Sequence, residues 1–129
     1  IRRAPGLGSL PSPNDGRELM AITVPDLLPG TLDLLILRML ASESMHGYGI
    51  AQRLKLLSAD VLQVGESSLY PALQRLLLNG YVDAEWAPSE NNRRARYYTI
   101  TKAGRRQLAA ERKEFDQLVA AIQRVLRTA

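Results

Sequence analysis

The sequence predicts a mainly α-helical domain that carries one small β-hairpin. Leucine-rich stripes at helical spacing recur along residues 31–79 and again after residue 101, which predicts several amphipathic helices. Between them, residues 81–100 change to an alternation of apolar and polar side chains that is typical of half-buried strands. Short helices followed by a hairpin and a last helix predict a winged helix-turn-helix domain over residues 29–101 and a separate C-terminal helix over residues 102–129.

The composition of the whole chain excludes several classes of protein. Its 129 residues are enough for one domain with a hydrophobic core but short for two. The absence of cysteine excludes disulfides and zinc-thiolate sites. The apolar runs are too short to span a bilayer or to act as a secretory signal, so we expect an intracellular protein without a membrane partner.

The first 28 residues have a different character from the rest. They are rich in proline and glycine and show no sustained periodicity, which predicts a flexible leader over residues 1–28. One hypothesis is that Met20 is the natural start and that residues 1–19 are upstream or expression-derived sequence. The intact mass of the natively expressed protein would decide this.

Two helices are expected next. Pro29-Gly30-Thr31 should end the leader and supply the cap of the first helix. Its apolar positions are Leu32, Leu35, Ile36, Met39 and Leu40. The second helix should start near His46 or Gly47. The apolar positions of that helix are Ile50, Ala51, Leu54 and Leu57.

A third helix is predicted from about Ser67 to Asn79. Its apolar stripe is formed by Leu69, Ala72, Leu73, Leu76 and Leu77. Pro71 lacks a backbone N–H and fits only within about the first turn, so we expect Ser67 or Ser68 to cap the helix. Asn79-Gly80 is a typical C-terminal stop.

The hairpin and the last helix follow. Val82, Ala84 and Trp86 alternate with polar residues on one predicted strand, and Tyr98 and Ile100 alternate similarly on the other. The polar, turn-rich segment 87–94 should form a long basic tip. The last helix should then run from a cap at Thr101 to about Leu126.

The net charge of +4 is unevenly distributed. Residues 93–129 hold ten basic and three acidic side chains, whereas acidic residues outnumber basic ones in residues 30–92. Six of the basic residues lie between Arg93 and Arg106, with no acidic residue among them. A concentrated cationic patch attracts the phosphate backbone of nucleic acids. The alternative, from charge alone, is a solvated charged face.

The third helix should present a polar face once its leucine stripe is buried. This face contains Ser67, Tyr70, Pro71 and Gln74, with Ser68 and Arg75 beside them. Amide and guanidinium groups can reach base edges in a major groove, while hydroxyls and a helix N-terminus can reach phosphates. In this topology the hairpin tip lies next to the helix, with Arg93 and Arg94 at the tip and Arg96 on the return strand. We therefore expect these nine residues to bind double-stranded DNA.

Catalysis is not expected. His46 is the only histidine, and the sequence offers it neither cysteine nor a recognisable nucleophile motif, so we predict no enzymatic activity, no metal site and no cofactor. His46 should instead pack at the second helix or cap it. Trp86, Tyr97 and Tyr98 could line a ligand pocket, but such residues are more typical of core and cross-strand positions in a small hairpin.

The last helix carries a heptad repeat. Leu108, Phe115 and Ile122 recur every seven residues, and Leu118 and Val125 form a second row. Such a stripe needs a partner, which is either the first helix of its own domain or a second subunit. We favour a homodimer through these five residues, which would place two recognition helices about 34 Å apart, one turn of DNA.

Residues from about 28 to 110 resemble the PadR family of bacterial transcription regulators. The motifs that carry the resemblance are His46-Gly47-Tyr48, Leu69-Tyr70-Pro71-Ala72-Leu73 and Tyr97-Tyr98-Thr99-Ile100-Thr101-Lys102-Ala103-Gly104. The resemblance implies a dimeric, DNA-binding repressor in the bacterial cytoplasm that reads a palindromic operator. It also implies that Tyr70 and the neighbouring Ser68 touch the DNA backbone.

One part of the family pattern does not transfer. Some members sense small aromatic molecules through a longer C-terminal region or a tryptophan on the final helix, whereas the corresponding region here is one helix without tryptophan. The sequence therefore leaves open whether an effector ligand exists. The alternative to a DNA-binding regulator is a winged-helix module that binds another protein without sequence-specific recognition of DNA.

Overall fold

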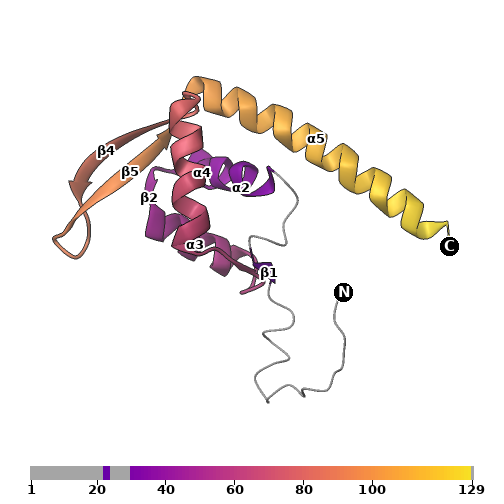
Figure 1. Cartoon of the computed structure of the whole chain (residues 1–129), viewed down its shortest axis with the longest axis horizontal. Coiled ribbons are helices and arrows are strands. Elements are labelled where there is room, and N and C mark those ends of the chain that lie inside the picture. Colours follow the sequence, from indigo (N-terminus) through magenta and orange to yellow (C-terminus); the bar gives the residue numbers. More distant parts are fainter. Residues whose placement is uncertain (1–21, 24–29, 129) are drawn as a thin grey trace, which may run out of the picture.

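Four helices and a three-stranded antiparallel sheet form the domain in the computed structural model, which describes residues 22–23 and 30–128 (Figure 1). The elements are β1 (Ile22–Thr23), α2 (Thr31–Ser42), β2 (Met45–His46), α3 (Gly47–Leu57), β3 (Leu62–Gln63), α4 (Glu66–Leu78), β4 (Val82–Pro88), β5 (Arg94–Ile100) and α5 (Lys102–Arg127). This arrangement confirms the predicted winged helix architecture. The leader and the start at Met20 stay predictions, because outside Ile22–Thr23 they lie beyond the described residues.

Helix α2 lies at the centre of the domain and contacts α3, α4, α5 and β5. Its buried residues are Leu32, Leu34, Ile36, Leu37, Met39 and Leu40. The cap comes from the predicted Pro29-Gly30-Thr31 segment: Gly30 occupies the N-cap and Thr31 is the first helical residue. Gly30 has a φ of 83°, a left-handed conformation that glycine adopts without steric cost, and its carbonyl accepts the first bond of the helix from Leu34.

Helix α3 begins where the sequence predicted. His46 is its N-cap, and its Nδ1 accepts a hydrogen bond of 3.0 Å from the Gly49 N–H. Ile50 and Leu54 are buried and Ala51 is half-buried. The expected burial of Leu57 is wrong, because Leu57 is the last residue of the helix and extends past the edge of the core.

Helix α4 begins at Glu66 with Gly65 at its N-cap, so the prediction that Ser67 or Ser68 caps it is wrong. Pro71 consequently lies in the second helical turn, on a face exposed to solvent, where water can reach the carbonyl that its missing N–H leaves free. The burial of Leu69, Ala72, Leu73 and Leu76 holds the helix in place. Asn79-Gly80 ends the helix as predicted: Gly80 has a φ of 78°, and the Tyr81 N–H donates to the Leu76 carbonyl over 2.9 Å.

The sheet has the strand order β2-β5-β4. Strand β2, two residues long, was not predicted, because two residues show no periodicity. Strands β4 and β5 form the wing of the fold, with Val82 opposite Ile100 at its base and Pro88 opposite Arg94 near its tip. The wing extends beyond the helices (Figure 1), so that Trp86, the cross-strand neighbour of Arg96, is 58% exposed and not part of the core. A separate parallel pair joins β1 to β3.

Helix α5 starts at the predicted cap, where the Thr101 Oγ1 accepts a hydrogen bond of 3.0 Å from the Gly104 N–H. Its first turns lie beside α2, and the helix then projects away from the domain (Figure 1). Among the described residues, none of the helices combines the length and the apolar character that crossing a membrane requires.

Candidate nucleic-acid interface

A groove of about 620 Å³ separates helix α4 from the wing. Its walls include Tyr70 of α4, Gly47 and Tyr48 at the start of α3, and Trp86, Arg94 and Arg96 of the wing. We call it the wing groove. It brings together residues of all three motifs on which the sequence prediction depends, and it places arginines of the wing beside a tyrosine of α4. The arrangement offers positive charge and hydrogen-bond donors to one elongated ligand.

The polar face predicted for α4 is the face that the helix exposes. Of the predicted residues, Ser67, Tyr70, Pro71, Gln74 and Arg75 are exposed and Ser68 is half-buried. The opposite face is buried against α2 and the sheet. The side chains predicted to touch DNA are therefore available to a ligand.

Tyr70 is 45% exposed and packs across the start of α3. A β-carbon added at Gly47 would lie 3.0 Å from the Tyr70 hydroxyl oxygen, so any larger residue at this position would require the Tyr70 ring to shift. Burial of the ring, followed by the negative charge of Glu66, raises the pKa of the Tyr70 hydroxyl above its ordinary value. The hydroxyl therefore stays protonated at neutral pH and can donate a hydrogen bond at the edge of the groove.

Arg75 differs from the other predicted DNA-binding residues. Its Nη2 donates to the Asp33 Oδ1 of α2 over a distance of 2.9 Å. This ion pair fastens the later turns of α4 to the central helix. The structure thus places Arg75 on the exposed face but with its charge already paired, whereas Gln74 beside it lies exposed one turn beyond Tyr70.

The two faces of the wing carry opposite charges. Cross-strand partners in an antiparallel pair point to the same face, so Trp86–Arg96 and Pro88–Arg94 share the face that lines the wing groove. The alternate positions include Asp83 and Glu85, whose exposed carboxylates lie on the other face. A polyanion would therefore be attracted to the groove and repelled from the outer face.

The turn at the wing tip is held by its own hydrogen bonds. The Arg93 carbonyl accepts from the Ser89 backbone N–H at 2.7 Å and from the Ser89 hydroxyl at 2.8 Å. Asn92 takes up the left-handed conformation, with a φ of 61°. The Arg93 side chain is left exposed at the tip. The tip therefore presents its arginine from a defined turn.

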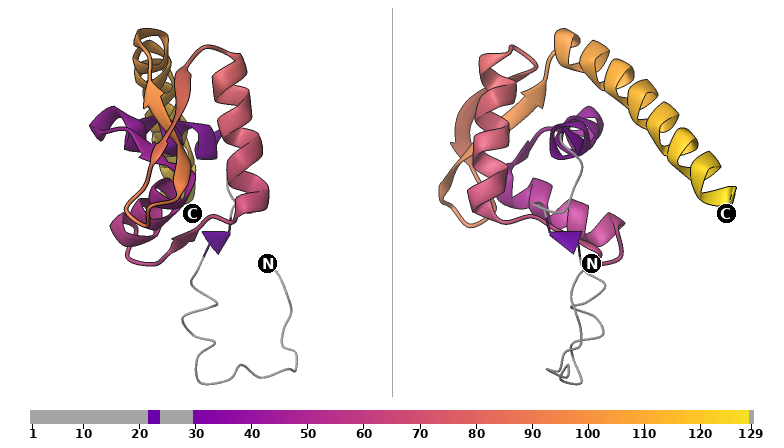
Figure 2. Two further views of the ribbon diagram at one scale, coloured as in Figure 1. Left: turned by 90° about the vertical axis from the view of Figure 1, so that its left-hand side faces the viewer. Right: turned by 45° about the vertical axis from the view of Figure 1, so that its right-hand side comes forward.

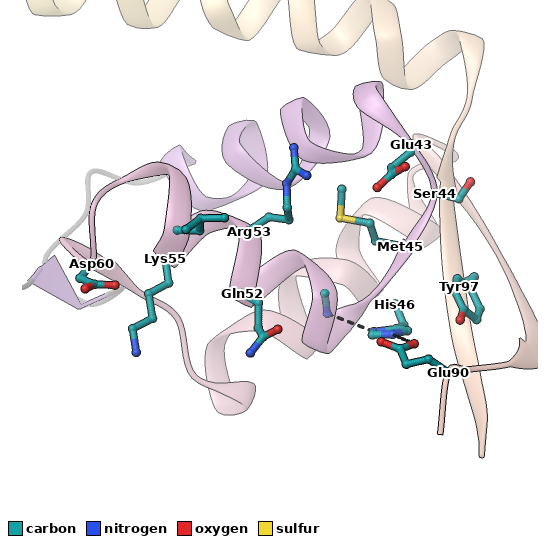
Figure 3. Close-up of a pocket in the computed structure, with 12 residues that line it drawn as sticks. Glu43, Ser44, Met45, His46, Gln52, Arg53, Lys55, Asp60, Glu90 and Tyr97 are labelled. Atoms are coloured by element: carbon teal, nitrogen blue, oxygen red, sulfur yellow. Dashed lines mark hydrogen bonds and ion pairs between the residues drawn. The ribbon is translucent and has the colours of Figure 1, made fainter. Parts of the chain in front are cut away.

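His46 joins the start of α3 to the wing tip. Its Nε2 lies 3.6 Å from the Glu90 Oε1, and its ring meets the edge of the Tyr97 ring at a centroid distance of 5.2 Å (Figure 3). The backbone N–H of Glu90 and then the His46 side chain hold the pKa of the Glu90 carboxyl below its ordinary value. These residues border a second pocket of about 540 Å³ on the outer side of α3, where Arg53 and Lys55 also lie (Figure 3).

The contacts of His46 hold the start of α3 and the wing tip together. Because its Nδ1 accepts from Gly49, the proton of the neutral ring lies on Nε2, which faces Glu90. Within residues 22–23 and 30–128, the acidic and histidine side chains form no cluster that could hold a metal ion. The predicted capping of the second helix by His46 is confirmed.

The residues predicted for dimerisation fall into two groups. Leu108 is half-buried against the core, and Phe115 is half-buried beside Leu34 of α2. Leu118 is 46% exposed, Ile122 41% and Val125 69%. Helix α2 thus covers the first part of the stripe, and the part of the chain that the structure describes leaves the second part exposed.

Trp86 and Gly47 line the groove but were not among the residues predicted to bind DNA. The sequence left Trp86 open between a ligand pocket and the core and cross-strand positions typical of a small hairpin. The available signal was strand length: a hairpin of two seven-residue strands is longer than the small helical core can cover. Gly47 was identified only in a motif and as a possible helix start, since its contact with Tyr70 joins residues far apart in sequence.

Comparisons with known proteins agree with this geometry. The sequence model of the transcriptional regulator PadR-like family matches residues 36–110, more than half of the chain. An uncharacterized protein from Lysinibacillus sphaericus is 29% identical over 93 residues, which cover 72% of this chain and 85% of that protein. A transcriptional regulator from Clostridium thermocellum superposes with a TM-score of 0.68 at 27% identity, covering 74% of this chain and 92% of that one. A PadR family transcriptional regulator from Eggerthella lenta gives a TM-score of 0.66 at 27% identity, covering 78% and 85%.

Proposed function

The chain belongs to the PadR-like family of transcriptional regulators, and from this premise we propose that it is a homodimeric, sequence-specific DNA-binding repressor that reads a palindromic operator. The observation that carries the proposal is the wing groove, where the exposed face of α4 and the arginine face of the wing meet. Such a protein would act on the bacterial nucleoid, in the cytoplasm. The proposal requires no enzymatic step, cofactor or metal.

Helix α4 is the proposed recognition helix. Its Gln74 amide has a donor and an acceptor that can bind an adenine edge in the major groove. The hydroxyls of Ser67, Ser68 and Tyr70 lie nearer the helix N-terminus, where backbone N–H groups also point outward and favour phosphate. Pro71 contributes an apolar surface among them. Arg75 supports the position of α4 through Asp33 and, in the free protein, is less available to DNA.

The wing is the proposed backbone clamp. Arg94 and Arg96 line the groove and Arg93 stands at the tip, so all three can reach phosphates of the strand that passes α4. Phosphate contacts fix the position of the protein on the duplex without reading sequence. Specificity would then depend mainly on α4 and affinity mainly on the wing.

The open part of the α5 stripe supports the homodimer. Leu118, Ile122 and Val125 expose apolar surface along one side of a helix that projects from the domain (Figure 1). Contiguous exposed apolar surface marks interaction sites, and a heptad spacing fits a second helix of the same kind. Two copies related by a twofold axis would present two α4 helices to successive turns of DNA.

The test is binding to a fluorescein-labelled duplex from the region upstream of the protein's own gene, measured by anisotropy as the salt concentration rises. A regulator that makes about six phosphate contacts should lose roughly a thousandfold in affinity between 50 and 200 mM salt. Arg93→Ala combined with Arg94→Ala should weaken binding to all sequences and flatten this dependence. The matched control is Arg53→Ala with Lys55→Ala, which removes two cations from the pocket on the outer side of α3 and should leave DNA binding unchanged.

Recognition of sequence is tested separately. Gln74→Ala should reduce the preference for the upstream duplex over a scrambled one while the salt dependence stays as in the wild type. A wild-type protein that binds neither duplex at low salt would instead favour the protein-interaction module. Repression is tested by a reporter under the upstream promoter, whose expression should rise when the gene for this protein is deleted.

A further inference from the structure

Trp86 is the only tryptophan of the chain, and its position is unusual for this residue type. The preceding residues on the same face of β4 are a buried Val82 and a half-buried Ala84, but Trp86 itself is 58% exposed. Where this face leaves the core, the residues that β4 itself contributes, Trp86 and Pro88, stay apolar instead of becoming polar as on a solvated strand. A large aromatic surface is therefore held in solvent on a projecting element, which is typical of contact residues in interfaces.

The neighbours of Trp86 indicate what would cover it. Arg96 is its cross-strand partner, and Arg94 lies two residues further along β5 on the same face. Both arginines line the wing groove together with the indole. Two residues of a strand span about 7 Å, which is comparable with the spacing of successive phosphates along one DNA strand. Two arginines anchored at this backbone spacing, with an apolar surface beside them, can bind successive phosphates while the apolar surface meets a sugar; in the free protein the Arg96 guanidinium lies over the Tyr98 ring, 5.9 Å from its centroid.

The charges on the wing favour a nucleic-acid backbone over a small aromatic molecule as the ligand of this face. The groove face carries Arg94 and Arg96 toward the tip, while the carboxylates of Asp83 and Glu85 lie on the opposite face nearer the base. Glu90 also lines the groove, but its carboxylate lies 3.6 Å from His46. An extended polyanion satisfies both arginines and reaches the indole, whereas a compact ligand would leave part of this face uncovered.

We propose that Trp86 is a DNA-contacting residue whose indole packs against the deoxyribose beside the phosphate bound by its cross-strand partner Arg96. The inference rests on the proposed DNA binding and adds to it an apolar contact made by the wing. Such a contact releases no counterions, because the indole carries no charge. Trp86 therefore contributes the part of wing affinity that does not depend on salt, and the arginines contribute the part that does.

The first test uses the fluorescence of Trp86, which no other tryptophan overlaps. Saturating the wild-type protein with unlabelled upstream duplex should change the Trp86 emission and protect it at least about twofold from quenching by acrylamide. Binding of the same duplex is followed independently by the anisotropy of a fluorescein label. Protection that develops at the DNA concentrations at which the anisotropy rises would support the contact.

The second test compares variants. Trp86→Ala should lower affinity about tenfold for both the upstream and the scrambled duplex, with the salt dependence unchanged, and Trp86→Phe should recover most of the loss. Arg94→Ala should lower affinity and flatten the salt dependence. Leu56→Ala removes an exposed apolar side chain from α3 outside the wing groove and should bind as the wild type does. Thermal melting verifies that each variant is folded.

The outcomes separate the two proposals. If the label shows tight DNA binding but Trp86 stays freely quenched and Trp86→Ala binds as the wild type, the inference is overturned while the proposed function stands. If Trp86→Ala loses affinity for one duplex only, the indole reads bases and the assignment to the sugar is wrong. If the wild-type protein binds no duplex at low salt, the proposed function and this inference fail together.

Discussion

The two halves of α5 carry one repeat but have different surroundings. Leu108 and Phe115, in the half that follows the wing, are half-buried against the domain. Ile122, one repeat further, and Val125 are exposed where the helix projects (Figure 2). The equal spacing of the apolar residues thus predicts one continuous stripe along α5. How far this stripe packs against its own domain depends on the position of α2. The comparison indicates that the first half stabilises the domain and that the second half is available to a second copy.

The first half is fixed by an unusually close approach of two backbones. Gly104, in the first turn of α5, packs directly against the carbonyl of Tyr81 at the base of the wing. That carbonyl also accepts a hydrogen bond of 3.0 Å from the Thr101 N–H. The start of α5 is therefore joined to the sheet, which sets the direction in which the rest of the helix leaves the domain.

Ile122→Glu tests the proposed role of the second half of α5 in dimerisation separately from the role of the first half in domain stability. A carboxylate in the middle of a dimer interface must be desolvated, so we expect monomers and a loss of operator affinity of about a hundredfold or more, because the two recognition helices no longer bind as a linked pair. The melting temperature of the isolated domain should change little. Sedimentation velocity and DNA-binding anisotropy measure the two effects.

The matched control is Ala120→Glu, which introduces the same charge on the opposite side of α5, where Ala120 is exposed. It should leave both the oligomeric state and the affinity for DNA unchanged. A protein that stays dimeric with Ile122→Glu would show that the second half of the stripe is not the dimer interface.

Gly104→Ala should instead destabilise the domain, because it changes the packing of the first half of α5. Its β-carbon would collide with the Tyr81 carbonyl and the Ile100 side chain, so α5 must shift away from the sheet at a cost of about 2 kcal/mol. Urea unfolding measures this loss of stability. Ala109→Gln is the control, because Ala109 is exposed on the same helix, and its effect should stay within about 0.5 kcal/mol. Equal effects of the two variants would contradict the close packing of Gly104.

The elements that the sequence predicted well are those defined by a long apolar period. The stripes of α2 and α4 identify buried residues such as Ile36 and Leu73, because burial on one face of a helix requires that spacing. An error lies at the start of α4, where Gly65 occupies the N-cap that Ser67 or Ser68 was expected to provide. The backbone conformation decides which residue caps a helix, and the preference of residue types for cap positions does not reveal that conformation.

The candidate site was predictable in its residue types but not in its pairings. The Arg75–Asp33 ion pair joins residues 42 positions apart, and the contact of Tyr70 with Gly47 also connects two helices. A sequence pattern reports which side chains share a face of one element, whereas these contacts depend on how elements pack. The exposure of Trp86 is a similar case, since it depends on how far the wing extends beyond the core.

Glu111→Leu should produce the smallest effect and sharpen the comparison within the first half. Glu111 lies between Leu108 and Phe115 in the second row of the stripe. Its Oε2 accepts a hydrogen bond of 2.7 Å from the Gln107 side chain. Its buried Oε1 has no hydrogen-bond partner among the described residues. Removing a carboxylate oxygen that is desolvated without a hydrogen bond should stabilise the domain by about 1 kcal/mol, measured by thermal melting, with the oligomeric state unchanged. Lys113→Leu, at an exposed position, is the control and should stay within about 0.5 kcal/mol. A lower melting temperature for Glu111→Leu would mean that this carboxylate contributes to stability, and that the first half of the stripe is not a purely apolar contact.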